Sequence, residues 1–199
     1  MKLKTDFYER PDVVQIAKDL LGKYLFTRFD NVTTGGIITE TEAYNGIVDK
    51  ASHAYNDRRT ARTEIMYATG GTAYIYLCYG IHSLFNVVSN VQNVPHAVLI
   101  RAIYPTHGIN HMLARRGMKT MKKNLTAGPG TVSQALGIHY ADSGLSLLGN
   151  KIWIEDKGLV INEFKTTPRI GVAYAKEDAA LPYRFVIEHK ELEIVISNQ

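Results

Sequence analysis

Two pairs of strand-like runs, each joined by a short turn, constrain the fold of this chain more than any other feature of its sequence. The runs 23–29 and 35–44 flank a turn-rich stretch, and the run 72–90 carries aromatic and β-branched residues on both sides of Gly80. Such pairs are typical of antiparallel hairpins. The sequence therefore predicts an α+β fold with a mainly antiparallel sheet.

The remaining elements are predicted from local periodicity. Pro11 and Asp12 begin a stretch with apolar residues at helical spacing, and Gly22 follows its end, which predicts a helix over 11–21. Further predicted elements are helices over 108–121 and 131–136 and strands over 96–103, 151–155 and 184–196. Because the chain has 199 residues and shows neither an internal repeat nor a linker, we expect one domain spanning 1–199.

Cysteine content and hydropathy exclude several protein classes. The single cysteine cannot form an intramolecular disulfide or supply a cysteine zinc site. The N-terminal residues contain no apolar signal core, and no run approaches the roughly 18 apolar residues of a membrane span. We therefore expect a protein that is neither secreted nor bound to a membrane. We also expect it to be a monomer. Its expected location is the cytoplasm, with the nucleoid, in a bacterium, or the nucleus in a eukaryote.

The positive charge is concentrated in one segment. Residues 65–141 contain six Lys or Arg and five of the seven His, but no Asp or Glu. Residues 1–64 hold ten basic and ten acidic residues, and residues 142–199 hold seven and nine. The acid-free segment would project positive potential wherever it reaches the surface, so a polyanion is the expected partner. A solvated basic helix balanced by neighbouring acids explains the same pattern and remains an alternative.

The run Ile38–Tyr44 is the first candidate for chemistry. Strand alternation places Glu40, Glu42 and Tyr44 on one face, and the two carboxylates lie roughly 6.5 to 7 Å apart at the backbone. If they are partly buried, their pKa values perturb each other and one carboxylate can act as a base. Glu42 is the better candidate because it lies nearer the long polar connection 45–63. A charged solvent-facing edge strand is the alternative reading.

Three further residues interrupt the patterns around them. Tyr79 stands beside Gly80 at a predicted hairpin tip, where an aromatic ring can wedge between base pairs. Asn86 and Arg101 each interrupt an apolar strand, so each needs a polar partner or a ligand. For Tyr74, in mid-strand, a core position is the favoured interpretation.

Several common catalytic motifs are missing from the sequence. It contains no GxSxG, P-loop or GxGxxG pattern, which leaves serine-hydrolase, NTPase and dinucleotide functions without support. His107 and His111 are four residues apart, but no HExxH pattern accompanies them, and we interpret both as surface residues. We expect neither a metal nor a cofactor.

Taken together, these residues resemble the alkyladenine (3-methyladenine) DNA glycosylase family. The resemblance runs in order from about residue 7 to residue 190. Its motifs are Phe7-Tyr8, Leu20-Leu21-Gly22, Glu40-Thr41-Glu42-Ala43-Tyr44, His53, Arg59-Thr60-Ala61-Arg62, Tyr74-Ile75-Tyr76-Leu77-Cys78-Tyr79-Gly80, Asn86, Leu99-Ile100-Arg101-Ala102, Gly128-Pro129-Gly130, Gln134-Ala135-Leu136-Gly137-Ile138, Arg169-Ile170-Gly171-Val172 and Arg184-Phe185.

The resemblance implies a compact domain with a curved sheet, peripheral helices and a β-hairpin that protrudes toward DNA. It implies a base-excision-repair enzyme that flips alkylated or deaminated purines out of duplex DNA and hydrolyses the N-glycosidic bond. The implied lesions are 3-methyladenine, 7-methylguanine, hypoxanthine and ethenoadenine. No lysine occupies a matched pocket position, so the implied enzyme uses water and has no lyase activity.

The resemblance also implies a role for each matched residue. Glu42 resembles the general base, and Arg101, with a backbone carbonyl near residues 170–172, would help to position the water. The base-binding pocket would consist of Tyr44, His53, Tyr76 and Asn86. Tyr79 resembles the residue that fills the gap left in the duplex, and the further candidates for DNA contact are His82, Arg59 and Arg62.

Two other functions stay open on the sequence alone. A damaged-DNA-binding module without catalysis would keep the basic segment and the aromatic wedge. A glycoside hydrolase would use Glu40 and Glu42 as its acid and base. We rank the glycosylase ahead of both.

Overall fold

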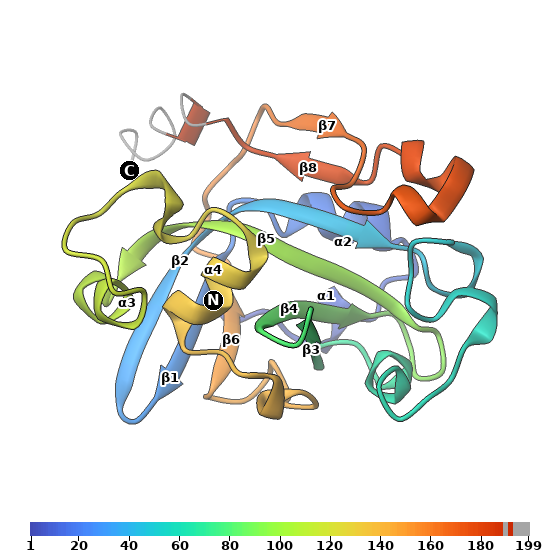
Figure 1. Cartoon of the computed structure of the whole chain (residues 1–199), viewed down its shortest axis with the longest axis horizontal. Coiled ribbons are helices and arrows are strands. Elements are labelled where there is room, and N and C mark those ends of the chain that lie inside the picture. The colour runs from blue at the N-terminus through green and yellow to red at the C-terminus, as the bar shows by residue number, and fades with distance from the viewer. Residues whose placement is uncertain (189–190, 193–199) are drawn as a thin grey trace.

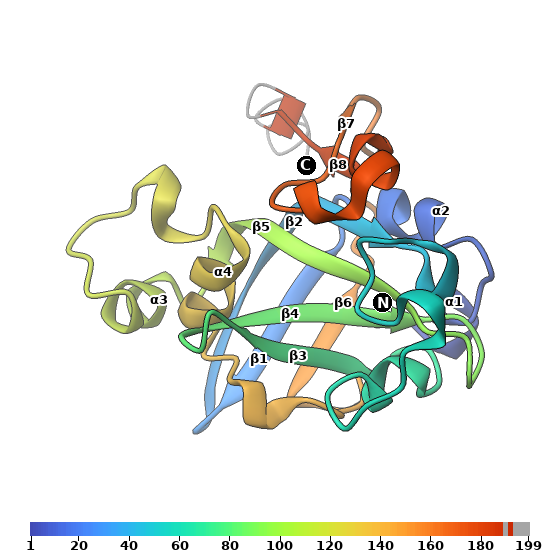
Figure 2. The same cartoon turned by 45° about the vertical axis from the view of Figure 1, so that its right-hand side comes forward.

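The computed structural model describes residues 1–188 and 191–192, and its centre is one antiparallel sheet (Figure 1). The strand order is β3-β4-β5-β2-β1-β6, and β8 pairs with both β2 and β7. The strands are β1 Tyr24–Phe29, β2 Val32–Tyr44, β3 Ala73–Cys78, β4 His82–Ser89, β5 His96–His107, β6 Ile152–Glu155, β7 Lys165–Thr167 and β8 Arg184–Val186. The sheet curls into half a barrel with few helices around it, which confirms the predicted α+β class (Figure 2).

The helices are short, and α2 and α4 pack against the sheet (Figure 1). The α-helices are α1 Thr5–Tyr8, α2 Val13–Asp19, α3 Ile109–Arg115 and α4 Pro129–Leu136. The 3-10 helices are η1 Gly46–Val48, η2 Tyr55–Asp57, η3 Glu64–Tyr67, η4 Lys123–Leu125, η5 Tyr140–Asp142 and η6 Ala173–Ala180. No helix in the described part of the chain is long and apolar enough to cross a membrane.

Strand β2 organises the fold because it pairs with three other strands. Residues 32–37 pair with β1, residues 40–42 pair with β8, and β5 runs along the opposite edge. Gly36 allows β5 to approach, since a Cβ at this position would overlap the carbonyl oxygen of Tyr104. A strand held on both edges is rigid, and this rigidity fixes the positions of the side chains that β2 carries.

Helix α2 covers one face of β2 and thereby directs the acidic side chains of β2 to the other face. The hydroxyl of Thr41 is buried and donates a 2.8 Å hydrogen bond to the carbonyl oxygen of Ala17 in α2. Glu40 and Glu42 flank Thr41 in the strand and therefore point away from the helix. The predicted shared face of Glu40, Glu42 and Tyr44 is confirmed by their contacts, described below.

The hairpin of β3 and β4 has a strained tip. Cys78 pairs with His82, and the turn between them contains Tyr79 with a φ of 51° and Gly80 with a φ of 73°. Two successive positive φ angles are typical of a type I′ turn. Glycine adopts this conformation freely, whereas it costs tyrosine about 1 to 3 kcal/mol. The tip thus holds a large aromatic residue at a position where it is conformationally unfavourable.

Two elements end well before the position that the sequence predicts. The helix predicted over 108–121 ends at Arg115, because Gly117 adopts a left-handed conformation with a φ of 62°. The strand predicted over 184–196 ends at Val186. Residues 189–190 and 193–199 of that prediction lie outside the described residues. The sequence analysis also missed α1 and β7, which are only four and three residues long.

Candidate active site

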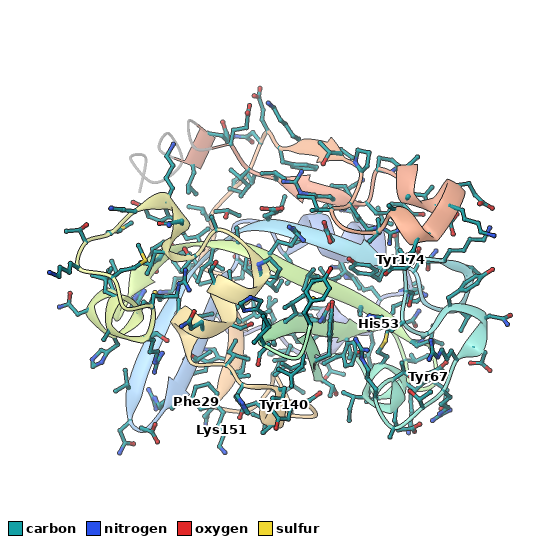
Figure 3. All side chains as sticks on the ribbon, viewed as in Figure 1. Phe29, His53, Tyr67, Tyr140, Lys151 and Tyr174 are labelled. Carbon is teal, nitrogen blue, oxygen red and sulfur yellow. The ribbon has the colours of Figure 1, made fainter. Side chains whose placement is uncertain are left out.

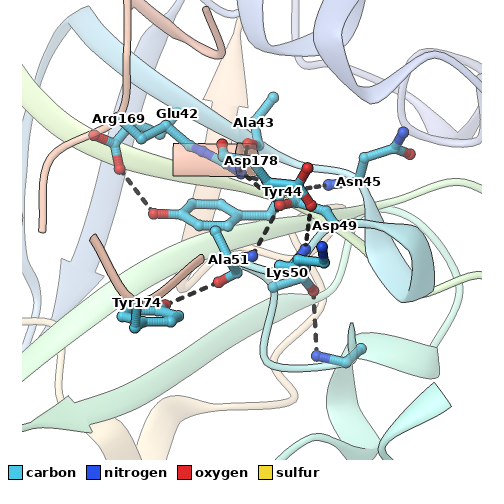
Figure 4. Close-up of polar contacts among 12 residues, drawn as sticks. Glu42, Ala43, Tyr44, Asn45, Asp49, Lys50, Ala51, Arg169, Tyr174 and Asp178 are labelled. Carbon is cyan, nitrogen blue, oxygen red and sulfur yellow. Dashed lines mark hydrogen bonds and ion pairs between the residues drawn. The ribbon is translucent and has the colours of Figure 1, made fainter. Parts of the chain in front are cut away.

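Glu42 is a charged residue with no exposed surface, near the end of β2. Its Oε2 accepts a 2.8 Å hydrogen bond from the hydroxyl of Tyr44, and its Oε1 accepts one of 2.8 Å from the backbone amide of Ile170 (Figure 4). The Nε of Arg101 lies 3.4 Å from Oε1. A buried carboxylate needs donors and opposite charge, and this one has both.

Arg101 reaches both glutamates because β5 bulges at this point. Glu40 pairs with Ala102 and Thr41 with Ile100, which leaves Arg101 without a partner in the β2–β5 register. A bulge redirects the side chain that it carries. From there the Nε of Arg101 donates a 2.8 Å hydrogen bond to Glu40 while lying beside Glu42.

Glu40 is bound by a second arginine. The Nε of Arg184 in β8 donates a 2.6 Å hydrogen bond to Oε1 of Glu40, the same oxygen that Arg101 contacts. Two guanidinium groups therefore hold the Glu40 carboxylate in place. Glu40 has a structural and electrostatic role here, which sets it apart from Glu42.

Opposing effects act on the pKa of Glu42. Burial raises this pKa, whereas the charge of Arg101 and the hydrogen bonds from Ile170 and Tyr44 lower it, and the nearby charge of Glu40 raises it. The net shift is upward from the ordinary value. Burial also raises the pKa of Tyr44 well above its usual range, with further contributions from the charge of Glu42 and the hydrogen bond to it. Tyr44 therefore stays protonated and can donate to the carboxylate.

A narrow slot lined mainly by aromatic rings opens beside Tyr44. It encloses about 310 Å³ of empty space, part of which is open to solvent. Figure 3 labels two residues of its wall, His53 and Tyr174, which come from segments far apart in the sequence. The lining residues are Tyr44, Ala51, His53, Met66, Tyr74, Tyr76, Asn86, Ala97 and Tyr174. The slot thus brings together all four residues of the predicted base-binding pocket.

The hydrogen bonds of His53 determine which of its nitrogens carries the proton. Nε2 lies 3.3 Å from Nη2 of Arg62, which can only donate, so Nε2 is the acceptor. Nδ1, 2.8 Å from the hydroxyl of Tyr74, then carries the proton and donates it to that oxygen. Burial, followed by the charges of Arg62 and Arg58, lowers the pKa of His53 to about 4. The ring is therefore neutral near pH 7, and it packs edge-on against Tyr76 at 4.6 Å.

Asn86 is buried and its amide nitrogen is satisfied by the protein backbone. Nδ2 donates to the carbonyl oxygens of Tyr74 and Leu84, at 3.1 and 3.2 Å. These bonds fix the side chain in the slot wall. The bonds to neighbouring backbone confirm one interpretation from the sequence, and Asn86 also lines the slot.

The hairpin residues lie outside the slot. Tyr79 is 93% exposed at the tip of the β3–β4 hairpin, and the neighbouring Ile81 is 72% exposed. The side chain of His82 lies against Gly130 at the start of α4. A large aromatic residue this exposed has no packing role in the isolated protein.

The two predicted arginine contacts differ in their surroundings. Arg62 is exposed and its guanidinium lies 4.9 Å from the centre of the Tyr76 ring, at the wall of the slot. Arg59 forms a bidentate ion pair with Glu64, at 2.8 and 2.9 Å, and lies over the ring of Tyr67. Glu64 therefore compensates the charge of Arg59 in this structure.

The acid-free segment contributes less free charge to the surface than its composition suggests. Arg101 contacts the glutamates, Arg115 donates to Thr34 and Ala135, and Arg116 donates to Leu125 and Gln134. Among the basic residues of this segment, the exposed ones are Lys119, Lys122 and Lys123. These three lysines are the part of the segment that presents charge to solvent.

Sequence reasoning missed two contributors to the site. The amide of Ile170 is a backbone donor, and no side-chain pattern reveals where a backbone amide will point. The backbone carbonyl that the resemblance implies near residues 170–172, as a partner of the water, is a separate group and stays a prediction. Tyr174 lines the slot and donates to the carbonyl oxygen of Ala51 at 3.0 Å. The abundance of tyrosine was a signal for such a residue, but nothing marked this one among the twelve.

Comparison with known proteins gives a consistent result over nearly the whole chain. Residues 6–191 match the family model described as "Methylpurine-DNA glycosylase (MPG)". A protein of Chlamydia felis named "Putative 3-methyladenine DNA glycosylase" is 49% identical over 95% of this chain and 97% of its own length. Proteins with the same name from Chlamydia pneumoniae and Bacillus cytotoxicus are each 43% identical, over 98% and 95% of this chain and 100% and 97% of their own lengths. The chain therefore belongs to the methylpurine-DNA glycosylase family, which consists of DNA N-glycosylases.

Proposed function

We propose that this protein excises alkylated or deaminated purines from duplex DNA by flipping the damaged nucleotide into the slot and hydrolysing its N-glycosidic bond. The substrate class is 3-methyladenine, 7-methylguanine, hypoxanthine and ethenoadenine. The observation that carries the proposal is a fully buried carboxylate, Glu42, held by three partners beside an aromatic slot. The partner is duplex DNA containing a damaged purine, and the protein acts as a monomer in the compartment that holds the DNA.

Glu42 acts as the general base in this proposal. Oε1 accepts from Ile170 and faces Arg101, whereas Oε2 accepts from Tyr44 and, in the described part of the chain, from no other hydrogen-bond donor. A carboxylate oxygen has two acceptor sites, so Oε2 retains one for water. Glu42 takes a proton from water, the water oxygen bonds to C1′, and the electron pair of the C1′–N bond leaves with the purine. The ionised carboxylate also stabilises the positive charge that develops on the sugar.

The slot suits a planar, electron-poor base. The rings of Tyr44, Tyr76 and His53 line it, and His53 packs edge-on against Tyr76. A cationic N3- or N7-alkylated purine gains about 0.5 to 2 kcal/mol from cation–π attraction to such rings. Tyr79 fills the gap left in the duplex, and Arg62, His82 and Arg59 belong to the DNA-facing surface. Within residues 1–188 and 191–192 no lysine lines the slot, which supports hydrolysis by water without a Schiff base.

Glu42→Gln tests the proposal. In single-turnover assays on duplexes carrying hypoxanthine or 3-methyladenine, excision should fall by about 10²- to 10⁴-fold. Affinity for the lesion should stay near that of the wild type, because the amide keeps the shape of the carboxylate. Unchanged excision by this variant would remove the catalytic assignment and favour a binding module. Strand cleavage without alkaline treatment would contradict the absence of lyase activity.

The glycoside-hydrolase alternative is not supported by the site. It needs Glu40 as an acid free to reach a glycosidic oxygen, but Arg101 and Arg184 both donate hydrogen bonds to Oε1 of Glu40. Only one of the two carboxylates is therefore placed for chemistry.

A further inference from the structure

A second buried ion pair lies near Glu42, and its two residues come from segments 120 residues apart in the sequence. Asp49 follows η1, and Arg169 lies in the segment between β7 and η6. The guanidinium binds the Asp49 carboxylate through both terminal nitrogens, with Nη2 2.9 Å from Oδ1 (Figure 4). The side chains are 0% and 1% exposed for Arg169 and Asp49.

The pair also binds the backbone on both sides of the site. Asp49 accepts hydrogen bonds from the amides of Asn45 and Ala51, at 3.0 and 2.9 Å. Nη1 of Arg169 donates to the carbonyl oxygen of Ala43 at 2.9 Å. Ala43 lies between Glu42 and Tyr44 in β2, and Ala51 lines the slot. One ion pair thus connects the end of β2, the slot wall and the segment after β7.

Two of the three partners of Glu42 lie next to this ion pair. Ile170 directly follows Arg169, and its amide donates to Oε1 of Glu42. The Ile170 side chain is 51% exposed, and its segment belongs to neither a strand nor a helix, so Arg169 is the buried anchor next to this amide. The guanidinium carbon of Arg169 also lies 4.9 Å from the centre of the Tyr44 ring, whose hydroxyl donates to Oε2.

Stability alone explains the pair poorly. Burying two charges costs several kcal/mol per ion, and well-packed apolar residues of similar volume often stabilise a fold equally well. The Nε of Arg169 is also buried and, within the described residues, lacks a hydrogen-bond partner. What a bidentate arginine–carboxylate pair supplies is a fixed geometry.

We propose that Asp49 and Arg169 are positioning residues that hold the Ile170 amide and the Tyr44 hydroxyl on Glu42, so that the general base keeps its reactive orientation. The inference rests on the proposed function, since it assigns a task to groups that serve Glu42. In this role, neither Asp49 nor Arg169 contacts the flipped purine. They act on the rate of bond cleavage through the two donors that fix the carboxylate.

Arg169→Lys is the main test, because it keeps the charge and removes the bidentate geometry. The single-turnover excision rate should fall about 10- to 100-fold, as expected when hydrogen bonds to a charged group are lost. The acid limb of the pH–rate profile should move to higher pH, because a carboxylate with fewer donors binds its proton more tightly. Affinity for the lesion duplex should stay within about threefold of the wild type, since the slot residues are unchanged.

Arg10→Lys is the matched control. Arg10 forms an ion pair with Asp19 at 2.6 Å and donates to a backbone carbonyl, but it lies outside the slot. This variant should keep the wild-type rate and pH profile. If Arg169→Lys also keeps both, the positioning role is wrong.

Ile170→Pro covers the case in which Arg169→Lys does not fold. Proline removes the amide hydrogen that reaches Glu42 and changes neither Asp49 nor Arg169. The same shift of the acid limb to higher pH should appear, and a wild-type profile in this variant overturns the proposal. The Glu42→Gln variant separates the two levels of inference. If Glu42→Gln loses excision while Arg169→Lys keeps the wild-type rate and pH profile, only the positioning role is refuted. If Glu42→Gln remains active, the proposed function itself is refuted.

Discussion

The hydroxyl of Tyr44 donates a 2.8 Å hydrogen bond to Oε2 of Glu42, a residue two positions earlier in the same strand. Alternation places both side chains on one face of β2. The proposed general base, Glu42, and one residue of the slot wall, Tyr44, are therefore neighbours on one rigid strand. Removing this hydrogen bond should therefore lower the excision rate more than it lowers the stability of the fold.

Tyr44→Phe should slow excision by about 10- to 100-fold, the range for loss of a hydrogen bond to a charged group. The ring remains in the slot, so lesion affinity should change little. Glu42 works as a carboxylate, and loss of a donor raises its pKa, so the acid limb of the pH–rate profile should shift to higher pH. Single-turnover rates across pH 4 to 8 measure this shift, and Tyr140→Phe, an exposed tyrosine outside the slot, is the control. An unchanged acid limb would contradict the role given to this bond.

Glu40→Gln should shift the acid limb in the opposite direction. The charge of Glu40 raises the pKa of Glu42, so its removal lowers that pKa and preserves the ionised base to lower pH. Excision at neutral pH should stay within a few-fold of the wild type, because Arg101 remains beside Glu42. The same pH series measures both quantities. Loss of excision as large as that of Glu42→Gln would show that Glu40 takes part in the chemistry.

His53 should make the free energy of unfolding depend on pH. Its pKa is about 4 in the folded protein and 6.5 as the ordinary value, so the unfolded chain binds the proton more readily. The contribution of His53 is therefore fully present above pH 6.5 and is lost as the pH falls toward 4, by about 3 kcal/mol. Denaturant titrations of wild type and His53→Asn between pH 7 and pH 4 measure this loss. The difference in stability between the two proteins should shrink as the pH falls, and a constant difference would contradict the neutral buried ring.

Substitutions at Tyr79 and Tyr74 should have separate effects, on DNA capture and on stability respectively. Tyr79→Asn should keep or slightly raise the melting temperature, because asparagine accepts the left-handed conformation of the tip better than tyrosine. It should weaken capture of the flipped nucleotide. Tyr74→Ala removes a buried ring and should lower the melting temperature by roughly 10 °C. Equal melting-temperature losses with intact lesion affinity in both variants would refute this separation.

Lys122 and Lys123 should contribute to the salt dependence of DNA binding. Binding to undamaged duplex should weaken steeply with salt, and replacing each lysine by glutamine should reduce the slope of log K against log salt by about one. Lys4→Gln, in the charge-balanced N-terminal segment, should leave the slope unchanged. Titrations at several salt concentrations provide the comparison. A wild-type slope near zero would remove the case for this segment as the DNA face.

The sequence by itself determined the class of fold and the chemical character of the site. The turns at Gly80 and before β2, together with β-branched and aromatic runs, indicated the antiparallel strands, because these signals are local in the chain. Alternation also placed Glu40, Glu42 and Tyr44 on one face. Short elements such as α1 and β7 escaped prediction, since four or three residues carry too little periodicity to be recognised.

Only the tertiary structure decided how these residues work together. The bulge that brings Arg101 to both glutamates, the amide of Ile170 on Glu42, and the Asp49–Arg169 pair each join segments up to 128 residues apart. Such contacts depend on strand register and on the path of irregular backbone, and neither leaves a periodic pattern in the sequence. Local sequence patterns therefore identified Glu42 as the candidate general base. Long-range packing set the burial of Glu42, its hydrogen-bond donors and its pKa.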